Sequence, residues 1–149
     1  MRRALLVLLV LATAAGGAAC GGGDDAATGT STTTVTTARA PVCDVVGDDH
    51  AAPTSNLEVT LDEWSIAAGP AAAGQVRVQA HNAGDVEHEL VLERADGTRI
   101  GKIEPFASGD TCQGTFQLTA GTYELFCGIV DEGGTSHRDA GMEMQLIVK

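Results

Sequence analysis

The sequence predicts an all-β protein whose single folded domain is a β-sandwich or barrel. Three observations predict this fold class. Short segments in the second half of the chain alternate apolar and polar residues, which places one face of each expected strand in a core. Turn residues separate these segments at short intervals, and none of them shows a convincing helix pattern. The chain has 149 residues, which suits one such domain better than two.

The expected strands all begin after residue 54. They lie at residues 57–61, 75–82, 88–94, 111–119, 122–127 and 142–149. Asp96-Gly97 is a strong turn signal after the third segment, and Ala120-Gly121 indicates a hairpin connection between the fourth and the fifth.

Residues 1–19 have the layout of a secretory signal peptide. Two arginines precede an apolar run at residues 4–15, which is too short to span a bilayer with margin, and small residues follow. The next residue, Cys20, makes the segment resemble a bacterial lipoprotein signal, although Gly17 stands where leucine is usual. The resemblance implies lipid on Cys20 and attachment to the outer face of the cytoplasmic membrane. The alternative is an ordinary cleaved signal and a secreted protein.

Residues 20–54 are expected to form a flexible tether, which leaves residues 55–149 as the folded domain. The tether is rich in Gly, Ala, Thr and Asp, and its low-complexity part at residues 28–41 has too little apolar surface to order itself. The formal net charge of −11 excludes nucleic acid as a partner, because the chain repels phosphate backbones.

Residues 121–149 place three soft or borderline metal donors close together. Cys127 stands at the expected end of one strand, and His137 and Met142 lie in the loop before the next. A second imidazole is expected from His88, which opens a strand after a turn at residues 82–87. Thiolate, thioether and imidazole together favour copper, and Cys-His₂ with a long axial Met is the ligand set of a blue-copper site. Met144 competes with Met142 for the axial position, and we favour Met142.

Two segments resemble the cupredoxins, the blue type 1 copper proteins. The segment HNAGDVEHELVL at residues 81–92 resembles the N-x-G-x-x-x-H segment of small bacterial cupredoxins, and GTYELFC…H…GM resembles their C-terminal copper loop. The relatives concerned are the plastocyanin/azurin family and the sulfocyanin-like secreted proteins, and the similarity covers residues 56–149. It implies a Greek-key β-sandwich that holds one copper ion, cycling between Cu(I) and Cu(II). The implied ligands are His88, Cys127, His137 and Met142.

The resemblance also assigns supporting roles. Asn82 and Gly84 match the residues that shape the turn before the first histidine, and Tyr123 matches a packing position. His137 matches the exposed edge through which electrons leave the protein. The sequence departs from the family in the nine residues between Cys127 and His137, where many relatives have two to five. We expect Trp64 to be a core residue rather than a redox relay.

The expected function is electron transfer without catalysis. Acidic residues beside the loop, Asp131, Glu132 and Asp139, would suit a basic redox protein as partner. The alternative is a copper-binding or copper-delivery lipoprotein that carries no physiological electron current. Copper oxidases and nitrite reductases need further histidine clusters, and the chain has four histidines in total.

Four cysteines can pair in three ways. If Cys20 carries lipid and Cys127 binds copper, Cys43 and Cys112 remain. An oxidising compartment favours a disulfide between them, and the alternative is two free thiols.

Overall fold

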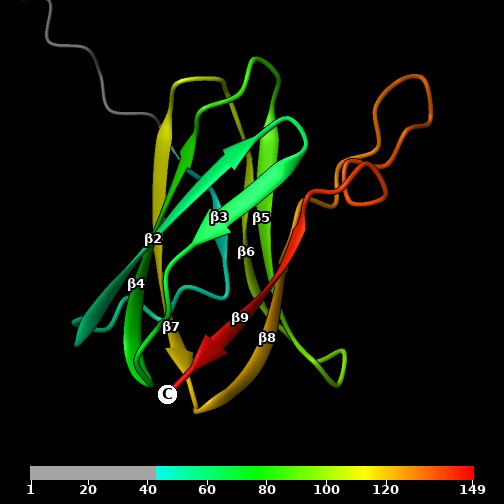
Figure 1. Cartoon of the computed structure of the whole chain (residues 1–149). Helices are drawn as coiled ribbons and strands as arrows, with labels where there is room; N and C mark the ends of the chain where they lie inside the picture. The colour runs from blue at the N-terminus through cyan, green and yellow to red at the C-terminus, as the bar shows by residue number, and fades with distance from the viewer. Residues whose placement is uncertain (1–42) are drawn as a thin grey trace, which may run out of the picture. The chain divides into compact units, whose positions relative to one another are not determined.

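The computed structural model describes residues 43–149, so the expected signal peptide and Cys20 lie outside the described residues. The described chain forms two β-sheets packed face to face and contains no α-helix (Figure 1). No helix among residues 43–149 is long and apolar enough to cross a membrane. The predicted all-β sandwich is confirmed.

Five strands form one sheet in the order β1-β6-β5-β8-β9, and four form the other in the order β3-β2-β4-β7. The strands are β1 (Val45–Val46), β2 (Ser55–Asp62), β3 (Ser65–Ala68), β4 (Gly74–Asn82), β5 (His88–Arg94), β6 (Arg99–Phe106), β7 (Thr111–Leu118), β8 (Gly121–Phe126) and β9 (Glu143–Val148). Only β2 and β4 pair in parallel among the named strands, and the other pairs are antiparallel.

Alternation along the strands builds the core between the sheets. In β2 every second side chain is buried, so Leu57, Val59 and Leu61 face inward while their neighbours face solvent. Strand β5 differs because it lies in the middle of its sheet, between β6 and β8, and its first five residues are all buried. The apolar inner faces of both sheets therefore fix the register, since a slip by one residue would expose them.

Six of the strands match the segments expected from the sequence, and three do not. The unexpected strands are β1, β3 and β6. Strand β6 carries Gly101 and Pro105, which weaken a strand pattern, yet it pairs with both β1 and β5. Tertiary pairing overrides local propensity here.

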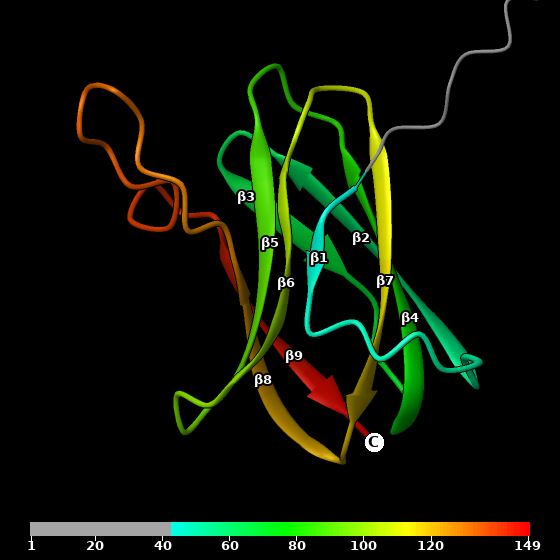
Figure 2. The ribbon, with the colours of Figure 1, turned by 180° about the vertical axis from the view of Figure 1, so that it is seen from behind.

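Residues 43–54, expected as the end of the tether, pack on the sandwich. Cys43 and Cys112 form a disulfide with a Cα–Cα distance of 5.6 Å, which confirms the expected pairing. Val45 then pairs with Ile103 at the edge of the five-stranded sheet (Figure 2). The packed domain therefore begins upstream of residue 55, because a covalent link and a free sheet edge order a segment whose composition alone would not.

Candidate metal centre

The predicted ligands come from neighbouring strands that meet at one end of the sandwich. His88 is the first residue of β5, and Cys127 directly follows the end of β8. Because β5 and β8 are antiparallel neighbours, the start of one lies beside the end of the other. The loop from β8 to β9 returns at this same end and carries His137 and Met142.

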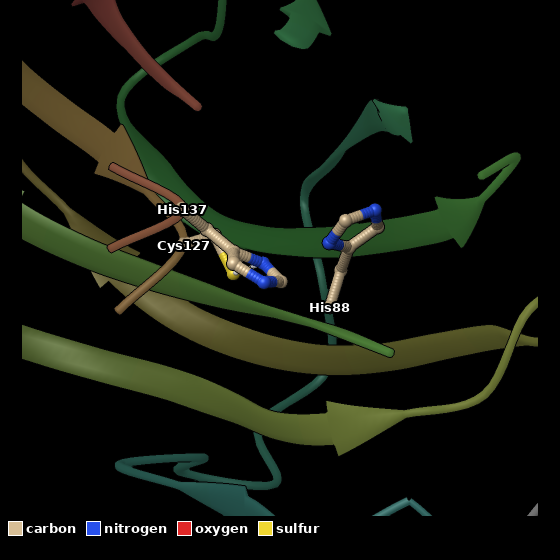
Figure 3. Close-up of side chains that lie close together, drawn as sticks. All are labelled: His88, Cys127 and His137. Carbon is tan, nitrogen blue, oxygen red and sulfur yellow. Dashed lines mark hydrogen bonds between the residues drawn. The ribbon is translucent and has the colours of Figure 1, made fainter. Parts of the chain in front are cut away.

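His88, Cys127 and His137 form a compact, buried group that could hold a metal ion. One donor atom from each residue lies within 4.8 Å of the other two. The Cys127 Sγ atom is 3.5 Å from His137 Nδ1, and the two imidazole centroids are 5.4 Å apart. Figure 3 shows the three side chains turned toward one another. The structure thus brings together three of the four residues predicted from the sequence.

One buried nitrogen in this group has no partner within the protein. His88 is fully buried, and its Nε2 lies 3.1 Å from Glu63 Oε1. Its Nδ1 is a buried polar atom without a hydrogen bond among the described residues. Leaving such an atom unpaired is unfavourable. A metal ion bound at Nδ1 would satisfy it, so this nitrogen fits a ligand role.

Met142 is fully buried, and its main chain is hydrogen-bonded to both Cys127 and His137. Its N–H donates to the carbonyl of His137, and its carbonyl accepts from the N–H of Cys127, both at 3.0 Å. Met144, the competing residue, is half-buried in β9 and pairs with Leu125. This placement is compatible with Met142 as the axial donor, which stays a prediction.

Burial favours the neutral forms of two donor residues, Cys127 and His88. It raises the pKa of the Cys127 thiol and lowers the pKa of His88. A buried neutral imidazole offers a lone pair, whereas the thiol must lose its proton when a metal binds. The N–H of Glu89 donates to Cys127 Sγ at 3.5 Å, which helps to stabilise a thiolate there. A set of one sulfur and two imidazoles suits copper.

Comparisons with known proteins identify the fold. No family model matches the chain, and no curated protein matches it. Among solved structures, auracyanin B matches 72 % of this chain and 97 % of its own, with 18 % identity and a TM-score of 0.57. A sodium-dithionite-reduced auracyanin from Roseiflexus castenholzii matches 66 % of this chain and 99 % of its own, with 16 % identity and a TM-score of 0.52. The chain has the cupredoxin fold.

The turn before His88 has the form that the cupredoxin resemblance implied. Asn82 is fully buried, and its Nδ2 donates to the carbonyls of Val86 and Phe106 at 2.8 and 3.1 Å. Its Oδ1 accepts from the N–H of Gly84 at 3.0 Å. One amide side chain therefore fixes the path of the chain into His88.

The long segment between Cys127 and His137 folds on itself. The N–H of Asp131 donates to the carbonyl of Thr135 at 3.0 Å, and Val130 pairs with Ser136 at the base. The N–H of His137 then donates to the carbonyl of Ile129 at 2.9 Å. Figure 1 shows this loop, in orange, reaching away from the sheets. The added residues thus form an excursion that closes on itself before the chain reaches His137.

Sequence reasoning missed the part played by the turn between β2 and β3. The ring of Trp64 packs edge-on against His137, with centroids 4.8 Å apart. The prediction that Trp64 lies in the core is wrong, because this residue is 41 % exposed. The prediction that His137 forms an exposed edge is also wrong, because His137 is only 3 % exposed. Trp64 covers it, and no motif signalled that a turn so far upstream would do so.

The neighbouring residue, Glu63, contacts the other histidine. Its carboxylate accepts from His88 Nε2 and from the N–H groups of Asp85 and Val86, at distances of 2.9–3.1 Å. These hydrogen bonds lower the pKa of Glu63, and the one from the N–H of Val86 has the largest effect. Two successive residues of one turn therefore hold the two imidazoles of the site.

Proposed function

We propose that this chain is a type 1 copper protein that binds one copper ion and transfers electrons. The observation that carries the proposal is the buried convergence of Cys127, His137 and His88, whose Nδ1 has no protein partner. These three residues would hold the ion, with Met142 as a weak fourth donor. Copper in such a set supplies one-electron chemistry, cycling between Cu(I) and Cu(II).

The packing around the site suits electron transfer better than catalysis. His88, Cys127 and Met142 are fully buried, and His137 is nearly so. Buried side chains in fixed orientations move little when the charge of the ion changes, which keeps reorganisation small. Because the donor residues are buried, we expect no open coordination position for a substrate.

We further propose a basic redox protein as partner. Asp131, Glu132 and Asp139 are exposed on the loop that carries His137. Carboxylates placed there would steer a positively charged surface toward this end of the sandwich. A lipid on Cys20 would hold the domain at the outer face of the cytoplasmic membrane, where such a partner would meet it.

The test is the optical and EPR spectrum of the full chain loaded with Cu(II). We expect intense visible absorption from thiolate-to-copper charge transfer, lost on reduction and recovered on oxidation. Cys127→Ser is expected to abolish that band, because a hydroxyl does not replace the thiolate. His81→Ala, which removes an exposed imidazole, is the matched control and should leave the band unchanged.

Two results would contradict the proposal. An unchanged visible band in Cys127→Ser would remove the thiolate from the site. A colourless wild-type complex that holds only Cu(I) would favour copper delivery in place of electron transfer.

A further inference from the structure

The carboxylate of Glu63 bridges the two sheets at the metal centre. Glu63 lies in the turn between β2 and β3, which belong to the four-stranded sheet, whereas His88 begins β5 of the five-stranded sheet. The hydrogen bond to His88 Nε2 crosses this boundary, and those from the N–H groups of Asp85 and Val86 hold the connection between β4 and β5. A side chain at Gly84 would collide with the carboxylate, so the turn is shaped to receive it.

This contact sets which nitrogen of His88 carries the proton. An ionised carboxylate only accepts hydrogen bonds, so Nε2 must be the protonated nitrogen. Nδ1 is then left with a free lone pair. Figure 3 shows one nitrogen of His88 turned toward His137 and Cys127 and the other turned away. The nitrogen bonded to Glu63 is unavailable to a metal, so the lone pair that faces the other donors is that of Nδ1.

The charge of Glu63 is not cancelled by a basic side chain. Among the ion pairs of the described residues, Glu63 pairs with His88 and with no Lys or Arg. The Glu63 side chain is 25 % exposed, and that of His88 is fully buried. A negative charge this close to a ligand stabilises a doubly charged ion more than a singly charged one.

We propose that Glu63 is a positioning residue that fixes His88 as an Nδ1 ligand and stabilises Cu(II) relative to Cu(I). The proposal rests on the copper function proposed above. Carboxylates that accept from a metal-bound histidine raise its basicity and orient its ring, and removing such a partner typically lowers metal affinity 10–100-fold. Here the partner comes from a turn 25 residues upstream of the histidine.

The experiment compares Glu63→Gln with Glu58→Gln in the full chain. Both variants remove one negative charge from the same hairpin, but Glu58 is exposed on β2 and lies outside the group of donors. We expect Glu63→Gln to lower Cu(II) affinity 10–100-fold and Cu(I) affinity less. Each tenfold preferential loss of Cu(II) corresponds to a 59 mV rise in the reduction potential. Glu58→Gln should leave both affinities and the potential unchanged.

The metal-free protein gives a second readout. Nitrogen-15 NMR of the His88 ring should show protonation at Nε2 in the wild type. In Glu63→Ala the population protonated at Nδ1 should be larger than in the wild type. Equal potentials in Glu63→Gln and Glu58→Gln, or an unchanged tautomer in Glu63→Ala, would overturn the proposal. Failure of the wild type to bind copper would instead overturn the proposed function, while the tautomer experiment would still report on Glu63.

A variant with a shorter carboxylate, Glu63→Asp, tests the proposal if Glu63→Gln does not fold. Glu63→Asp keeps the charge but withdraws it from Nε2 by one methylene. We expect it to shift the tautomer population and to weaken Cu(II) binding less than the neutral variants would. Wild-type tautomer and wild-type Cu(II) affinity in Glu63→Asp would show that the contact with Nε2 has no positioning role.

Discussion

Two segments carry the predicted ligands to the same end of the sandwich, and they are held there by different means. Residues 82–88 form a short turn whose shape depends on two polar side chains, the buried Asn82 and the partly exposed Glu63. Residues 127–142 carry three predicted ligands and are held by main-chain hydrogen bonds between those ligands. Stability is therefore concentrated in single side chains in the first segment and spread over the backbone in the second.

The second segment also has an outer clamp. Arg138 donates to Glu124 at 2.7 Å and to Glu143 at 2.8 Å, and its guanidinium lies 4.1 Å from the centre of the Phe126 ring. These partners belong to β8 and β9, the strands that enter and leave the loop. The clamp is half-buried rather than buried, so we expect removal of Arg138 to lower stability less than removal of the Asn82 side chain.

Asn82→Ala should have the largest effect on stability. The substitution leaves the carbonyls of Val86 and Phe106 and the N–H of Gly84 without their partner. Each unsatisfied buried group costs about 1–3 kcal/mol, partly relieved by relaxation, so we expect a loss of about 3 kcal/mol. Urea unfolding of the metal-free protein measures it. Asn56→Ala, at an exposed position in β2, should change stability by less than about 0.5 kcal/mol.

Equal losses in the two asparagine variants would contradict the contrast between the segments. They would mean that the turn is held by its main chain, as the second segment is. Copper-loaded Asn82→Ala could combine reduced stability with a normal visible spectrum. That result would still agree with the contrast between the two segments, because Glu63 also orients His88.

The sequence predicted much of the fold because its signals are local. Alternation of apolar and polar residues in β2 and β4 predicts strands with one buried face. The segments around Cys127 and His88 carry the motifs that predict the metal ligands. The disulfide between Cys43 and Cys112 followed from assigning the other two cysteines. Strand β6 was missed because Gly101 and Pro105 are unfavourable in strands and interrupt its sequence pattern. Its pairing with neighbouring strands in the sheet makes it a strand.

The contribution of the turn between β2 and β3 could not be predicted from local signals. Glu63 and Trp64 meet His88 and His137 only because the two sheets pack with this turn over the end of β5. Their separations in sequence are 25 and 73 residues, and no spacing rule links a turn to imidazoles so distant. His137 is buried in that packing contact, whereas Trp64, its partner, stays 41 % exposed.

Arg138→Ala should have an intermediate effect. The Arg138 side chain is 34 % exposed, and its partners Glu124 and Glu143 are 42 and 54 % exposed. Solvent therefore screens the two ion pairs, and with the contact to Phe126 we expect a loss of about 1 kcal/mol. Arg99→Ala is a close control, because Arg99 lies over the same ring at 5.7 Å and is 53 % exposed. Its loss should stay below about 0.5 kcal/mol. Urea unfolding at low and high salt would test both, and an effect of Arg138→Ala that does not diminish with salt would argue against the clamp.

Replacing residues 131–135 by Asn-Gly should have the smallest effect. Val130 and Ser136 pair across the base of the excursion, and a two-residue turn of this composition closes such a pair. We expect stability to change by less than about 0.5 kcal/mol, because shortening a surface loop alters its closure entropy little. The visible spectrum should not change, since the hydrogen bond from His137 to Ile129 lies inside the base. A shifted spectrum would mean that the excursion positions His137, and the second segment would then depend on more than its main-chain bonds.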